Sequence, residues 1–152
     1  MPVVSSIFLV TALVLAVVIG PQTRPWTWGP AMIALGISVL AAIPTIWRRG
    51  KAPGDFGLLA FGTLPAAWFA WRAWISPVAE LGQADLLLLG AAVAAFVSIR
   101  AISGNLLAER ILSWGLALLL LANVVVIANQ LSDPSYSPVF RNRASGKMIS
   151  GF

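Results

Sequence analysis

The sequence predicts an all-α protein: a multi-span transmembrane helical bundle with about five transmembrane helices, N-in and C-out. Two observations lead to this class. First, 59% of the 152 residues are hydrophobic and only 10% are charged, whereas soluble domains carry about 25% charged residues. Second, the apolar residues form five blocks, each near the length of about 20 residues that a helix needs to cross a bilayer. A soluble fold could not cover its surface with so few polar side chains.

The five blocks follow one another along residues 1–130, which form the predicted membrane region. The first block ends at "PQTRP", and it lacks the basic start and the small-residue cleavage site of a signal peptide. We therefore interpret it as a retained helix. The second block stops at the charged "RRGK", and the third and fourth are rich in small residues that permit close helix packing. The blocks are Val3–Gly20, Pro30–Trp47, Phe56–Ile75, Asp85–Ile102 and Leu106–Gln130.

Polar residues and prolines inside the blocks have structural interpretations. Pro44 and Pro65 interrupt the second and third blocks, and membrane helices tolerate such kinks when neighbours satisfy the freed carbonyl. Asp85 opens the fourth block, where a first-turn carboxylate is stabilised by the helix dipole; a proton relay is the less favoured alternative. Asn123, Asn129 and Gln130, in or at the end of the fifth block, predict hydrogen bonds between helices.

The charges of the loops predict the orientation. The loop after the second block carries Arg48, Arg49 and Lys51, and the loop after the fourth carries Arg100 and Arg110. Cytoplasmic loops are enriched in Lys and Arg, so we predict that the N-terminus lies inside. Residues 131–152 then form a basic outer (periplasmic) loop or tail. Its three cations oppose this orientation, but the internal loops outweigh them.

Composition also limits the chemistry. The chain has no cysteine and no histidine, which excludes disulfides, thiolate metal sites and histidine-ligated cofactors, and we expect no metal and no cofactor. The net charge of +5 fits orientation and lipid head groups better than nucleic acid, so membrane lipids are the expected partners. No carboxylate pair, nucleophile–base pair or glycine-rich phosphate loop is visible. The catalytic residues are therefore unknown, and enzymatic activity stays undecided.

A tryptophan-rich segment, "WFAWRAW", closes the third block. Trp68, Trp71 and Trp74 lie near the predicted outer end of this helix. Indole rings settle at membrane–water interfaces, so we interpret the three residues as interface anchors. Arg72, between them, is interpreted as a cation that reaches the surface, with binding of an anionic head group as the functional alternative.

Two stretches of the chain are distinctive. "LAFGTLPAAWFAWRAWISPVAELGQADLLLL" contains a Trp–Ser–Pro turn, formed by Trp74, Ser76 and Pro77 with Ile75 between. "LANVVVIANQLSDPSYSP" ends the fifth block and leads to the basic "RNRASGKMISGF". Over residues 56–152 these stretches resemble bacterial O-antigen ligases and O-antigen polymerase-like membrane proteins. In that family the second stretch corresponds to the end of the fifth helix and the start of a periplasmic loop.

The resemblance implies a role in glycan assembly for lipopolysaccharide. Such proteins transfer a sugar chain from an undecaprenyl diphosphate carrier at the outer face of the bacterial inner (plasma) membrane, in which they are multi-pass. They usually have ten or more spans, and the active-site basic residues lie in the second half. Nothing follows Phe152 in this sequence. The chain is therefore expected to be the N-terminal portion of such an enzyme, interrupted at an outer loop and inactive alone.

A lipid diphosphate requires cations at head-group depth, and the fork of an arginine side chain binds phosphate oxygens in a bidentate way. The candidates on the predicted outer side are Arg72, Arg141, Arg143 and Lys147. For the cations of the tail, an ordinary solvated loop is the alternative. The rival function is a non-catalytic small membrane subunit that packs around a larger complex, with other membrane subunits as partners. A small transporter is weaker, since no inverted repeat is visible.

Overall fold

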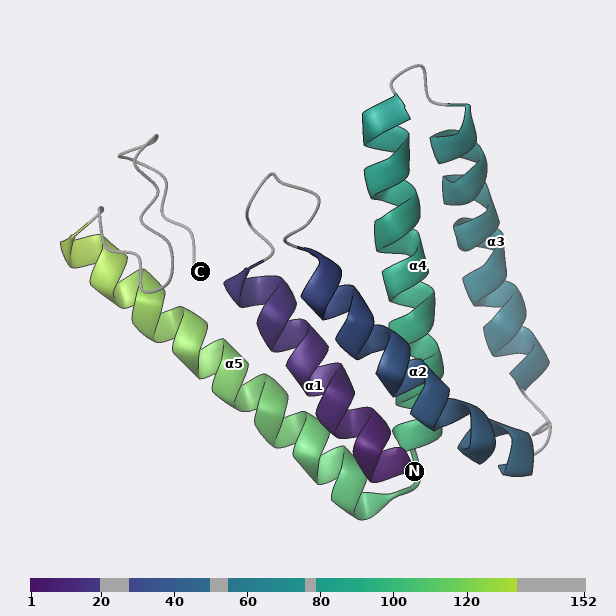
Figure 1. Cartoon of the computed structure of the whole chain (residues 1–152), viewed down its shortest axis with the longest axis horizontal. Coiled ribbons are helices and arrows are strands. Elements are labelled where there is room, and N and C mark those ends of the chain that lie inside the picture. The colour runs from purple at the N-terminus through teal and green to yellow at the C-terminus, as the bar shows by residue number, and fades with distance from the viewer. Residues whose placement is uncertain (20–27, 50–54, 76–78, 134–152) are drawn as a thin grey trace.

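The computed structural model describes residues 1–19, 28–49, 55–75 and 79–133. Within these ranges the chain forms five α-helices and no strand (Figure 1), which confirms the all-α prediction. The helices are α1 (Pro2–Val18), α2 (Gly29–Arg49), α3 (Asp55–Trp74), α4 (Ala79–Ile102) and α5 (Leu106–Ser132).

The helix boundaries agree with the apolar blocks except at one place. α4 begins at Ala79, six residues before the block that starts at Asp85. The added segment, "AELGQA", is too polar to belong to an apolar run, but its residues are compatible with a helix that continues past the hydrocarbon. Asp85 therefore lies in the second turn of α4 with an exposed side chain, and its interpretation as a first-turn residue is wrong.

The helices run alternately in opposite directions and form an open layer (Figure 1). In this view the order across the layer is α5, α1, α2, α4 and α3, and the C-terminal part of α4 passes behind α2 and contacts α1. α1 contacts α2, α5 and α4, while α3 packs on α4. The N-terminus lies at the same end as the α4–α5 turn. α3 and α5 therefore form the two edges of the layer, and α1 lies between neighbours on both sides.

Three helices, not five, are long and apolar enough to cross a membrane among the described residues. They are α2, α4 and α5. α1 is apolar but has only 17 residues, about 25 Å of helix against a hydrocarbon core of about 30 Å. α3 has 20 residues, but three tryptophans, Pro65 and Arg72 lower its hydropathy. The predicted number of five helices is thus confirmed. Only three of the five have the length and composition of a membrane span.

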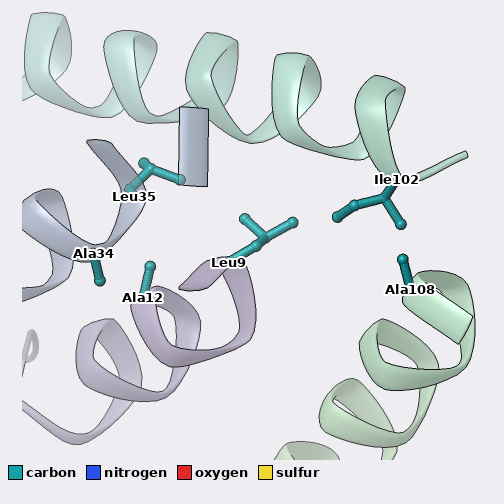
Figure 2. Close-up of a cluster of buried hydrophobic side chains, with 6 residues drawn as sticks. All are labelled: Leu9, Ala12, Ala34, Leu35, Ile102 and Ala108. Carbon is teal, nitrogen blue, oxygen red and sulfur yellow. The ribbon is translucent and has the colours of Figure 1, made fainter. Parts of the chain in front are cut away.

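The core is small and consists mainly of small side chains. Leu9 lies at its centre, with Leu35 on one side and Ile102 on the other (Figure 2). Among the described residues only four large apolar side chains are buried, whereas 31 are exposed. The cluster comprises Leu9, Ala12, Ala34, Leu35, Ile102 and Ala108. In water this surface would be a severe aggregation liability, so an apolar solvent around the helices accounts for it better.

A tight turn joins α4 to α5. Gly104 adopts a positive φ of 81°, a conformation that glycine reaches without the strain of a Cβ atom. The side chain of Asn105 accepts a hydrogen bond from the Ala108 N–H at 3.0 Å and caps α5. The Gly104 N–H donates to Glu109 Oε1 at 2.7 Å. These bonds fix the direction in which α5 leaves the turn.

α1 and α5 approach each other closely at Gly115. A Cβ atom built on Gly115 would lie 2.6 Å from Val10 Cγ1 and 2.7 Å from Val10 Cγ2. Gly36 and Gly90 have no such neighbour within 4 Å. The absence of a side chain at Gly115 therefore sets the distance between α1 and α5.

We expect Gly115→Ala to lower the free energy of unfolding by about 1–3 kcal/mol, the usual cost of overpacking. The added methyl group must displace Val10, whose branched side chain has few alternative rotamers. Thermal unfolding in detergent measures the effect. Gly90→Ala is the matched control and should be neutral or stabilising, because its site is open and alanine favours a helix.

Val10→Ala in the Gly115→Ala background should restore most of the lost stability, since it removes the atoms that clash. A Gly115→Ala protein as stable as the wild type would contradict the close approach of α1 and α5.

Candidate functional site

The last two turns of α3 bring the three predicted anchor residues and Arg72 together. Trp68, Trp71 and Trp74 are 61%, 62% and 81% exposed, and they extend over about 9 Å of helix. Arg72 lies in the last turn of α3 and is exposed. This end of α3 is opposite the end at which α1 begins (Figure 1). The site thus combines indole surfaces with one guanidinium group.

The other candidate cations cannot be placed beside Arg72. Arg141, Arg143 and Lys147 lie outside the described residues. α5, which precedes this segment, ends at the same end of the layer as α3. A joint site of Arg72 and the tail therefore stays a prediction.

Two further tryptophans, which were not predicted as interface anchors, lie at the ends of α2. Trp28 directly precedes α2, and Trp47 lies in its last turn with 85% of its surface exposed. The two are 19 positions apart (47 − 28), about 28 Å along a helix, which is close to the hydrocarbon thickness of about 30 Å. The signal was present in the sequence, because Trp28 precedes the second apolar block and Trp47 ends it.

Three buried serines form a polar junction between three helices, which we call the serine junction. Ser5 of α1, Ser38 of α2 and Ser98 of α4 are all 0% exposed. Ser38 Oγ lies 2.8 Å from the Ser5 carbonyl oxygen, 3.1 Å from Ser5 Oγ and 2.9 Å from Ser98 Oγ. These three serines could not be predicted from the sequence, because isolated serines in apolar blocks carry no spacing signal.

The serine junction has the geometry of a packing device. A nucleophilic serine needs a general base within hydrogen-bond reach, whereas Ser38 contacts two hydroxyls and a carbonyl oxygen. Hydrogen bonds of this kind between membrane helices contribute about 0.6 kcal/mol each on average. The junction therefore positions α1, α2 and α4.

The asparagines of α5 bond within their own helix. Asn123 Nδ2 donates to the Leu119 carbonyl oxygen at 2.9 Å, and Asn129 Nδ2 donates to that of Val125 at 2.9 Å. The prediction of interhelical hydrogen bonds is therefore wrong for both residues. A short amide side chain reaches the carbonyl one turn back without a partner helix.

The described arginines divide unequally between the two ends of the layer. Arg48 and Arg100 lie at the C-terminal ends of α2 and α4, and Arg110 lies near the start of α5. All three helix ends are at the end where α1 begins (Figure 1). Arg72 lies at the opposite end. The end where α1 begins is therefore the more basic of the two.

The described residues contain no group of three or more His, Cys, Asp or Glu side chains that could hold a metal ion. No family model matches the chain, and no curated protein and no solved structure matches it. Fold and sites together define a class: an all-helical chain with three helices able to cross a membrane, by length and composition, and with aromatic residues at the helix ends.

We expect Trp68, Trp71 and Trp74 to lie at a membrane interface. In a variant that keeps these three and replaces the other four of the seven tryptophans with phenylalanine, brominated lipids should quench fluorescence most when the bromines are near the head groups.

A variant that keeps only Trp114 is the matched control. Trp114 lies eight residues into α5 and is 69% exposed, about 12 Å along the helix, so deeper bromines should quench it best. Strongest quenching of the α3 tryptophans at the bilayer centre would contradict their role as anchors.

Proposed function

We propose that all five helices cross the membrane, so that the chain is a five-span integral membrane protein. The position of α1 supports this. It lies between α2 and α5, two of the three helices with the length and composition of spans (Figure 1). A helix packed between two spans lies at their depth, and 17 residues are at the short end of the spanning range of about 17–25 residues. α3 lies beside α4, the third such helix.

The same proposal places the N-terminus inside and the end of α5 outside. Arg48, Arg100 and Arg110 at one end of the layer support this orientation, because cytoplasmic ends of membrane helices are enriched in Arg and Lys. The opposite end holds Arg72 and the acidic Asp85 and Asp133 among the described residues. Arg72 and the α3 tryptophans would then face the outer leaflet.

Alkaline phosphatase fused after Gln130 should be active, and the same enzyme fused after Lys51 should be inactive. The reason is that the phosphatase folds only outside the cytoplasm, and α2, which precedes Lys51, and α5, which contains Gln130, end at opposite ends of the layer (Figure 1). Enzyme activity in intact cells, normalised to the amount of fusion protein, measures the difference. The reverse pattern would overturn the orientation and place Arg72 inside.

We further propose that the chain corresponds to the first five spans of a glycan ligase or polymerase of the O-antigen type. Such a protein acts on an undecaprenyl-diphosphate-linked glycan at the outer face of the bacterial inner membrane. The observation that supports this is the end of α3, where Arg72 lies between Trp71 and an exposed Trp74 at the edge of the layer. An arginine at head-group depth beside open lipid is what a lipid diphosphate requires.

The second candidate is a non-catalytic membrane subunit that packs around a larger complex. It is favoured by the described side chains, in which every buried polar atom already has a hydrogen-bond partner. A chain whose polar groups serve its own packing needs no reaction to explain them. The two edges of the layer, α3 and α5, would then contact other membrane subunits.

Undecaprenyl diphosphate binding distinguishes the two functions. Replacing Arg141 and Arg143 with glutamine should weaken binding at least tenfold, because each cation–phosphate hydrogen bond contributes about 1.5–3 kcal/mol and 1.4 kcal/mol is one decade of affinity. Arg72→Gln should weaken it similarly. Titration of the chain in nanodiscs with undecaprenyl diphosphate measures these affinities, and undecaprenol should bind wild type and variants equally.

Arg110→Gln removes the same charge at the other end of the layer and is the matched control, so its affinity should equal that of the wild type. If the Arg141 and Arg143 variant binds the diphosphate as well as the wild type does, the tail is an ordinary solvated loop. If Arg72→Gln is equally without effect, the subunit is the better description.

A further inference from the structure

A groove lies at the end of the layer opposite Arg72. The start of α1 contributes Met1 and Pro2, and the last turns of α2 contribute Pro44, Thr45 and Arg48. The groove has a volume of about 380 Å³, which is within the range of small-ligand sites. It is open on one side, so a molecule could enter it from the surrounding solvent or bilayer.

The lining combines an apolar wall with polar groups on one helix. Pro44 and Arg48 are one turn apart on α2 and so share a face, and Thr45 is half-buried next to them. Arg48 is exposed, so its guanidinium group is accessible to a ligand. Pro44 has no N–H, which leaves the carbonyl of Leu40 without its usual helix donor. Trp47, 85% exposed, marks the depth of this region as the membrane interface.

The charges around the groove indicate which kind of ligand it binds. Arg100 and Arg110 lie at the same end of the layer as Arg48 (Figure 1). Asp55, the first residue of α3, and Glu109 are at this end too, so the arginines outnumber the carboxylates there and this end attracts anions. The Glu109 carboxylate of that end accepts a hydrogen bond from the Gly104 N–H and is engaged in the α4–α5 turn. An occupant that is anionic at one side and apolar at the other matches Arg48 and Thr45 on one side and Met1, Pro2 and Pro44 on the other.

We propose that this groove binds the phosphate head group of an anionic phospholipid. Arg48 donates a bidentate pair of hydrogen bonds to the phosphate oxygens, and the Thr45 hydroxyl donates a further one. The glycerol and the first acyl carbons pack against the apolar wall. The inference rests on the proposed placement in a bilayer and not on glycan transfer, because the site lies at the end of the layer away from Arg72.

The test is binding of phosphatidylglycerol to the full chain in detergent, followed by native mass spectrometry. Wild type should retain phosphatidylglycerol at least tenfold more tightly than zwitterionic phosphatidylcholine. Arg48→Gln should lose at least tenfold in affinity for phosphatidylglycerol, and Thr45→Val should lose less. Arg110→Gln, which removes an equal charge outside the groove, should change affinity by less than a factor of three.

Each of the following outcomes would contradict the proposed lipid site. Equal losses in Arg48→Gln and Arg110→Gln would show diffuse attraction to a basic surface without a groove site. Displacement of the lipid by millimolar inorganic phosphate would show a free-phosphate site. Equal retention of phosphatidylglycerol and phosphatidylcholine by the wild type would refute the proposal. Because the phosphatase fusions report membrane placement separately, this last result would leave the five-span topology intact.

Discussion

The close packing of α1 against three neighbours is the constraint on which the rest of the structure depends. In a bilayer, apolar side chains gain little by leaving lipid for one another, so helices associate through tight packing and hydrogen bonds. α1 packs on each of its neighbours through a different kind of contact. Gly115 of α5 leaves room for Val10, alanines lie between α1 and α2, and the serine junction joins α1 to α2 and α4. α1 has only 17 residues and is the shortest described helix, so these contacts matter most for its position.

A consequence of this packing is that, among the described residues, the charged side chains able to bind a polar ligand lie mainly at the ends of the helices. Buried polar atoms of the described side chains all have partners. Polar side chains on outward faces bond to their own helix instead, as Thr11 does to the Ile7 carbonyl oxygen and Asn129 to that of Val125. The outward faces of the described helices are therefore mostly apolar between the helix ends. Arginines and most of the exposed tryptophans that could meet a polar ligand lie where the helices end.

Helix number and most boundaries were predictable because apolar runs are interrupted by charged or proline-rich segments. The start of α4 was not, since hydropathy detects the hydrocarbon-buried part of a helix and not the polar turns beyond it, here from Ala79 to Ala84. The serine junction was not predictable either. Each of α1, α2 and α4 is apolar around most of its circumference, so no periodicity shows which face meets a neighbour. Only the three-dimensional arrangement brings Ser5, Ser38 and Ser98 together.

The two edges of the layer differ in chemistry, and this difference bears on function. α5 presents exposed leucines and valines along most of its length, with only Ala108, Val126 and Gln130 buried. Lipid tails can cover such an apolar surface without any other partner. α3 instead carries exposed indoles and Arg72 near its end, a composition that lipid tails do not require and that lowers the hydropathy of the helix. A ligand or partner with an anionic or polar head group would contribute contacts that lipid tails cannot. If the chain is the proposed portion of a glycan ligase or polymerase, the α3 edge is where its glycan carrier would meet it, and the α5 edge is where it would meet lipid or another apolar helix.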